Sequence, residues 1–262
     1  MEFLRAAKRR SLLSELIYVL LNISLAVAVL VTVWAVESPL LAFALVLLSK
    51  WRVLAVRPRF WFAHVQANTI DFIVSLSFVV LLYATGSVGT GAAIQIILTM
   101  LYIVWLLVIK PRTRRSLVVI QAGVALFFGT MALYATSFEW PSSLVVIGMW
   151  VIGYSAARHV LAAYSESQLV FLSFLWAMVM AELGWLAYHW TIAYNLPFAT
   201  ELKLPQVAIV ALALSFLAER TYGSYVQHGT LKASELALPA MLSFGVIALL
   251  LLAFNAVSAG TI

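Results

Sequence analysis

Long apolar runs, separated by short polar or charged breaks, dominate the hydropathy pattern of this chain. A helix needs about 20 apolar residues to cross a hydrocarbon core of roughly 30 Å. Nine runs approach or reach this length, at residues 14–36, 39–56, 66–85, 91–109, 116–137, 142–164, 168–194, 205–225 and 236–257. The pattern predicts an all-α, polytopic integral membrane bundle of about nine transmembrane helices, in which residues 1–262 form a single transmembrane domain.

The breaks between the runs have the chemistry expected of helix ends. Pro39, Pro141 and Pro205 lie at predicted helix starts, where the missing N–H costs little. The second run is the least regular, because Lys50 and Arg52 interrupt it. These side chains can extend toward the headgroups, so residues 39–56 are predicted either to span the membrane or to form a re-entrant or tilted interfacial segment.

The charges predict an orientation. Fifteen of the sixteen Lys and Arg residues fall on one side of the membrane when the nine spans are laid out, and Lys203 is the exception. The loops of the other side carry Glu37, Glu139 and Glu201. Because basic residues accumulate in cytoplasmic loops, we expect a cytoplasmic N-terminus and an outer C-terminus in the cell (cytoplasmic or inner) membrane.

The composition supports a membrane protein and excludes several classes of function. The chain is 65% hydrophobic and 10% charged, whereas soluble domains carry roughly 25% charged residues. The net charge of +6 lies in short loops beside apolar runs, so we expect the lipid bilayer, and not a nucleic acid, as the partner. The chain has no cysteine, which excludes thiolate metal sites, and no cofactor or metal is expected.

A displacement of 102 residues aligns similar features of the two halves. Lys8 and Glu37 then match Lys110 and Glu139, so that a basic entry and an acidic turn recur in register. This alignment suggests two parallel four-helix repeats followed by a ninth helix, an arrangement found in some transporters.

Glu182 is the first candidate site residue. It lies about 21 Å into the seventh predicted span, near the middle of the membrane. Carboxylates at such depth usually face the bundle interior or a cavity and carry function, so we expect a proton or cation site. His189 lies two turns further on nearly the same face and could extend this site. The alternatives are a hydrogen-bonded carboxyl that joins helices and a histidine in an interfacial aromatic belt.

Asp71 is the second candidate. It shares a helix face with Ser75, near the predicted cytoplasmic end of the third span. A substrate or ion site is one interpretation. The other is an ion pair at the membrane surface with Arg52, Arg57 or Arg59, which lie at a similar predicted depth.

Basic and aromatic residues alternate from the end of the second run into the loop that follows it. Such a segment attracts anionic lipid headgroups and anchors its rings in the interface, and it could also bind the phosphate of a lipid-linked substrate. The candidate anionic-lipid contacts are Lys50, Trp51, Arg52, Arg57, Arg59 and Trp61.

The sequence contains no phosphate-binding loop and no dinucleotide-binding motif, which favours a function other than catalysis. Three hypotheses follow. The first is a small carrier or transporter that uses an intramembrane carboxylate. The second is a non-catalytic scaffold or subunit of a membrane complex, with another membrane protein as partner. The third is an enzyme acting on lipid phosphates, with Asp71 and Glu219 as an acidic pair.

Overall fold

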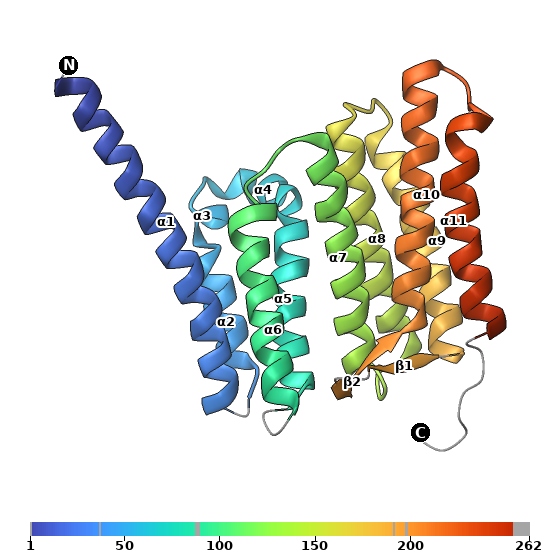
Figure 1. Ribbon diagram of the computed structural model, residues 1–262, viewed down its shortest axis with the longest axis horizontal. Coiled ribbons are helices and arrows are strands. Elements are labelled where there is room, and N and C mark those ends of the chain that lie inside the picture. The colour runs from blue at the N-terminus through green and yellow to red at the C-terminus, as the bar shows by residue number, and fades with distance from the viewer. Residues whose placement is uncertain (1, 37, 87–89, 191, 197–198, 254–262) are drawn as a thin grey trace.

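Long helices running side by side form the computed structural model of the protein (Figure 1). It describes the chain except for residues 1, 37, 87–89, 191, 197–198 and 254–262. The first half of the chain forms α1 (Glu2–Ala35), α2 (Leu40–Ser49), α3 (Trp51–Leu54), the 3₁₀ turn η1 (Pro58–Phe60), α4 (Trp61–Ala67), α5 (Thr69–Ala84), α6 (Thr90–Val104) and the π-helical turn η2 (Trp105–Ile109). The second half forms α7 (Arg115–Thr136), α8 (Ser142–Ala163), α9 (Leu169–His189), β1 (Ala193–Leu196), β2 (Ala199–Pro205), α10 (Gln206–His228) and α11 (Ala233–Ala253).

Seven helical segments of the described chain are long and apolar enough to cross a membrane, as a helical membrane bundle requires. They are α1, α6 continued by η2, α7, α8, α9, α10 and α11. Counting the bent pair that ends in α5 as one span raises the number to eight. The predicted count of nine is therefore not confirmed, and the difference comes from the second and third predicted spans.

The second predicted span is shorter than expected. In place of a helix over residues 39–56, α2 has 10 residues and ends where Lys50 begins a new turn. A helix of that length rises about 15 Å, half of the hydrocarbon thickness. The physical reason is that the Lys50 side chain turns into the protein and does not extend along the helix toward the surface, as described below.

The third predicted span is bent. Residues Pro58–Ala67 and Thr69–Ala84 meet at an angle of 67°. Asn68 lies at the bend, where its side-chain amide donates to the His64 carbonyl oxygen at 2.8 Å. α4 ends before this residue and crosses the end of the bundle, whereas α5 follows the long helices (Figure 1).

The segment after α9 adds the only strands of the described chain. The predicted helix over 168–194 ends at His189, and β1 and β2 form an antiparallel two-stranded hairpin in which Ala193 lies opposite Pro205. Gln206 closes it with a backbone hydrogen bond of 2.8 Å to the Ile192 carbonyl oxygen. The predicted outer loop is therefore a short sheet beside an otherwise all-α bundle.

The helix contacts follow the same order in two groups of four. α1 and α5 each contact both α2 and α6, and α7 and α9 each contact both α8 and α10. α5 packs against α7 between the groups, and α11 packs on α10. The 4+4+1 repeat stays a prediction, because a similar pattern of helix contacts in the two groups is not by itself evidence of an internal duplication.

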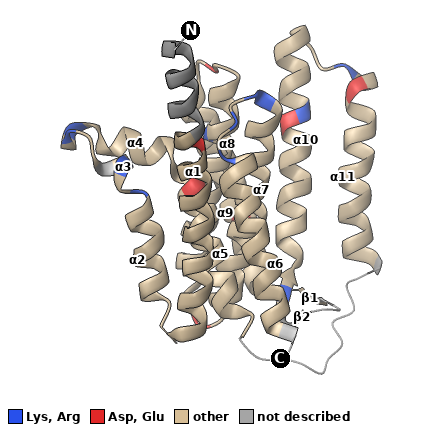
Figure 2. Cartoon of the chain, turned by 60° about the vertical axis from the view of Figure 1, so that its left-hand side comes forward, with Lys and Arg blue, Asp and Glu red and all other residues tan. Residues whose placement is uncertain are grey.

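Lys and Arg positions gather toward one end of the described bundle (Figure 2). This is the end at which α3 and α4 lie and at which α10 connects to α11. β2, which carries Lys203, lies at the opposite end. We call the first of these the basic end.

Candidate functional site

A buried ion cluster joins three elements at the basic end. Asp71 lies in the first turn of α5, and its side chain is 10% exposed. Lys50 Nζ, after α2, lies 2.5 Å from Asp71 Oδ2, and Lys110 Nζ, after η2, lies 2.8 Å from the same oxygen. The Lys50 side chain is 5% exposed, so both members of this first pair are removed from solvent.

The second oxygen of Asp71 is also in contact with hydrogen-bond donors. Ser75 Oγ lies 3.4 Å from Oδ1, and Trp105 Nε1 lies 3.3 Å from it. The π-helical turn η2 brings Trp105 and Lys110 to the same carboxylate, through a backbone bond of 2.9 Å from the Lys110 nitrogen to the Trp105 carbonyl oxygen. Both carboxylate oxygens have partners, as a buried charge requires, so the cluster holds the ends of α2 and η2 against the start of α5.

This cluster differs from the predicted one. Asp71 was expected beside Arg52, Arg57 or Arg59, but the side chains of these arginines are exposed and its partners are Lys50 and Lys110. The position of Lys50 does not fit its predicted role as a lipid contact, because its side chain is buried against Asp71. Asp71 and Ser75 were predicted to share a helix face, and the Ser75 hydroxyl does donate to Asp71 Oδ1.

The other predicted lipid contacts share one surface. Trp51, Arg52, Arg57, Arg59 and Trp61 are all exposed on the segment from α3 to α4. Phe60 and Phe62 add exposed rings, and the Arg59 guanidinium carbon lies 4.6 Å from the centre of the Phe60 ring. Residues 51–67 are called the interfacial segment below.

Glu182 lies on the outer surface of α9. Its side chain is exposed, and so are Met178 and Trp185, which lie one turn to either side of it. His189 is exposed on the same helix, where its ring meets that of Trp185 at 4.6 Å between centroids. The expected interior position is not found, and Glu182 is separated from Asp71, which is buried among α2, α5 and η2.

Gln121 of α7 forms a junction between the charged break after η2 and α8. Its Nε2 donates to the carbonyl oxygens of Ile109 at 2.7 Å and Arg112 at 2.9 Å. Its Oε1 lies 2.7 Å from His159 Nε2 on α8. One side chain of α7 thus holds the charged break after η2 against two helices.

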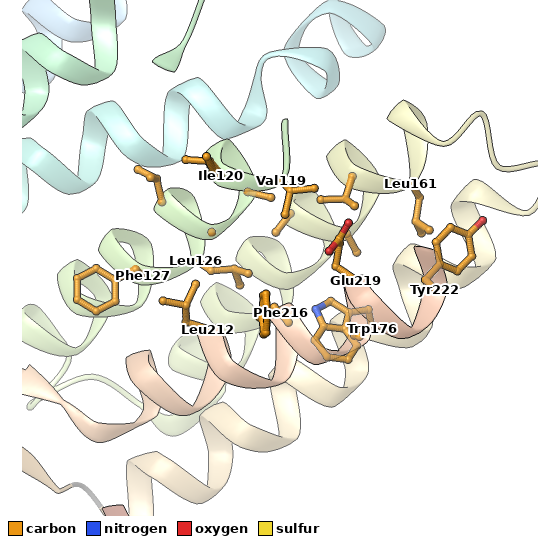
Figure 3. A pocket seen from close by; sticks show the side chains of 18 of the residues that line it. Val119, Ile120, Leu126, Phe127, Leu161, Trp176, Leu212, Phe216, Glu219 and Tyr222 are labelled. Carbon is orange, nitrogen blue, oxygen red and sulfur yellow. The ribbon is translucent and has the colours of Figure 1, made fainter. Parts of the chain in front are cut away.

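A cavity of about 600 Å³ lies among α7, α8, α9 and α10. Its walls are apolar, and Glu219 and Tyr222 lie with Trp176 toward one end, whereas Phe127 lies at the other (Figure 3). Glu219 accepts a hydrogen bond of 2.8 Å from the Tyr164 hydroxyl.

Glu219 and Asp71 belong to separate clusters. Glu219 lines the cavity among α7–α10. Asp71 is paired instead with Lys50 and Lys110, in the group formed by α1, α2, α5 and α6. Among the described residues, no three His, Asp or Glu side chains are grouped as a metal site would need. Comparisons with protein-family models, with curated proteins and with solved structures found no match.

Proposed function

We propose that the protein is a non-catalytic subunit of a membrane complex and that the outer face of α9 contacts a helix of its partner. The observation that carries this proposal is the exposed position of Glu182, about 20 Å from Leu169 and about 10 Å from His189 along α9. A carboxyl group at this depth is costly in contact with lipid and is retained where it finds a polar partner.

The neighbours of Glu182 fit a helix contact. Phe171, Leu175, Met178, Glu182 and Trp185 follow one another at three- and four-residue intervals and are all exposed. This spacing forms one stripe along the helix, the pattern by which a helix docks in an apolar groove. The partner chemistry that fits is a membrane helix with a hydrogen-bond donor or cation at the depth of Glu182.

The same geometry weighs against the other two hypotheses. A carrier needs a polar group on a route through the bundle, whereas Glu182 faces outward and Asp71 is paired with lysines. An enzyme acting on lipid phosphates would need Asp71 and Glu219 at one centre, and they lie in separate clusters.

Site-specific crosslinking tests the proposal. A photoreactive side chain at Met178, on the stripe, should capture one defined membrane protein in native membranes, and mass spectrometry should map the link to a helix bearing a donor residue. The matched control is Met241 on α11, which is also exposed. Glu182→Leu should abolish the Met178 product and Glu182→Gln should retain part of it. Equal products from Met178 and Met241, or no effect of Glu182→Leu, would contradict the proposal.

We also propose that the N-terminus lies in the cytoplasm and the C-terminus outside the cell membrane, so that the chain crosses the membrane an odd number of times. The clustering of Lys and Arg at the basic end supports this orientation (Figure 2). Tags at Met1 and Ile262 test it. A protease added outside intact cells should remove only the C-terminal tag, and equal cleavage of both tags would contradict the odd number of crossings.

The interfacial segment is proposed to contact anionic headgroups. Its exposed arginines and aromatic rings support this proposal, because each basic residue near an anionic membrane surface contributes about 1 kcal/mol to the attraction. Replacing Arg57 and Arg59 together by Gln should lower the preference of the purified protein for anionic over zwitterionic lipid in native mass spectrometry. An unchanged preference would contradict this contact.

A further inference from the structure

The cavity among α7–α10 has the length of one membrane leaflet. On α7 its lining runs from Val119 to Phe128, a rise of about 14 Å, and on α10 from Leu212 to Tyr222, about 15 Å. Half of a hydrocarbon core of about 30 Å has the same depth. The cavity begins one turn inside Arg115, the first residue of α7, so it occupies the half of the bundle at the basic end.

The cavity is apolar and reaches the lipid-facing surface. Its volume of about 600 Å³ falls in the usual range for ligand sites, roughly 300–1,000 Å³. Ile120 and Leu175 line it and are 47% and 56% exposed, so its rim is open sideways between the helices. A hydrocarbon chain could therefore enter from the surrounding leaflet without crossing a polar region.

The polar end of the cavity carries both signs of charge. The Arg115 guanidinium carbon lies 4.2 Å from the centre of the Tyr164 ring, and the Tyr164 hydroxyl donates to Glu219. Arg220 Nε lies 3.6 Å from Glu219 Oε2 and its side chain is 58% exposed. Tyr222, which lines the cavity, donates its hydroxyl to Glu166. Two arginines and two carboxylates thus surround this end, and their formal charges balance.

One polar atom inside the cavity lacks a partner. Ser215 Oγ is buried and has no hydrogen-bond partner among the described residues, and Ser215 lines the wall one turn inside Glu219. An unpaired buried hydroxyl costs free energy. A ligand with an oxygen one helical turn below its headgroup would satisfy it, as the ester of a glycerolipid does.

From these observations we propose that the cavity binds one acyl chain of a zwitterionic phospholipid, with the ester near Ser215, the phosphate near Arg115 and Arg220, and the ammonium group near Glu219. The depth of the cavity selects the chain, the balanced charges select the headgroup, and the lateral opening provides the route. This site shares Leu175 with the α9 stripe, but it is argued from the cavity and its polar end and does not depend on the complex proposed above.

Quenching of Trp176 by a brominated lipid tests the site. Trp176 lines the cavity, and bromine on a bound chain quenches an indole that it touches. Delipidated full-length protein in detergent is titrated with phosphatidylethanolamine brominated at mid-chain. Wild type should show saturable quenching that the Trp176→Phe variant loses. Absence of this component in the wild type would overturn the proposal, whether or not any variant folds.

A pocket-filling variant and its control complete the test. Ala218→Phe on α10 places a ring in the cavity and should weaken the quenching isotherm at least about tenfold, equal to about 1.4 kcal/mol. Val226→Phe, exposed on the same helix and outside the cavity, should leave it unchanged. Equal affinities of these two variants would overturn the site.

A third arm tests the headgroup. A free fatty acid with the same brominated chain should bind at least about tenfold more weakly than the phospholipid, because it lacks the ammonium and phosphate groups. Equal affinity of the fatty acid would overturn the phospholipid assignment. Arg57→Gln with Arg59→Gln, at the interfacial segment, should not alter any of these isotherms, which separates this site from surface lipid.

Discussion

Lys50 and Lys110 direct their ammonium nitrogens to one oxygen of Asp71, at 2.5 and 2.8 Å. The first lysine follows α2 and the second follows η2, so a single carboxylate joins the short helix, the start of α5 and the end of α6. Because two cations share one anion in a site largely closed to water, the stability of this end depends on Asp71 more than on either lysine.

Asp71→Asn should lower the free energy of unfolding by about 3–5 kcal/mol, because removing one partner of a buried ion pair leaves uncompensated charge. Thermal unfolding in detergent measures the effect. The double variant with Lys50→Met should recover part of the loss, since Lys110 is 33% exposed and can turn toward water. Glu139→Gln, at an exposed carboxylate, is the matched control, and an equal effect of the two single variants would contradict the prediction.

Hydropathy predicted seven of the helices well but not the region around this cluster. The runs that became α1 and α6–α11 are continuous, so their length alone indicated a span. The second run contains Lys50, and a one-dimensional pattern cannot tell a lysine that extends to the headgroups from one that pairs with Asp71. The bend before α5 lies at Asn68, whose side chain bonds to a carbonyl oxygen of α4, and a hydropathy pattern does not report such local bonds.

The outward position of Glu182 also could not be read from charge alone. α9 is apolar on every side, so its sequence does not mark a polar face. The buried side is marked instead by small residues, Ser173, Ala177, Ala181 and Gly184. That stripe of small side chains was the available signal, and Glu182 lies outside it.

Gln121→Leu should destabilise the protein by about 1–3 kcal/mol, because carbonyl oxygens of the break after η2 and the His159 ring lose their partner. The break should also become more accessible, which limited proteolysis between Lys110 and Arg115 would detect. Asn22→Leu is the control, since Asn22 bonds only to the Tyr18 carbonyl oxygen of its own helix among the described contacts. Equal cleavage of Gln121→Leu and wild type would contradict this role.

Gly153→Ala and Gly184→Ala should each destabilise the α8–α9 contact by about 1–3 kcal/mol, the usual cost of overpacking. A Cβ at Gly153 would lie 2.6 Å from Met180 Cβ, and one at Gly184 would lie 2.6 Å from Met149 Cγ. Gly245→Ala on α11 is the control, because a Cβ there meets nothing within 4 Å. Unfolding temperatures of the three variants measure the difference, and equal values for all three would show that the helices can separate at no cost.

Glu166, between α8 and α9, makes part of the stability depend on pH. Hydrogen bonds from the Tyr222 hydroxyl and then from the Gln168 backbone nitrogen hold the pKa of its carboxyl below the usual value. A carboxyl whose pKa is lower in the folded state contributes stability that is complete above the unfolded pKa of about 4.3 and is lost as the pH falls through the folded value.

The melting temperature of wild type should therefore exceed that of Glu166→Gln by a constant amount between about pH 6 and 8, and the difference should shrink as the pH falls below about 4.3. Tyr222→Phe, which removes the first of the two donors, should narrow the same difference at neutral pH. Glu139→Gln, at an exposed carboxylate on another loop, serves as the reference. A wild-type advantage that persisted undiminished to pH 3 would mean that the charge of Glu166 is not what joins the α8–α9 turn to α10.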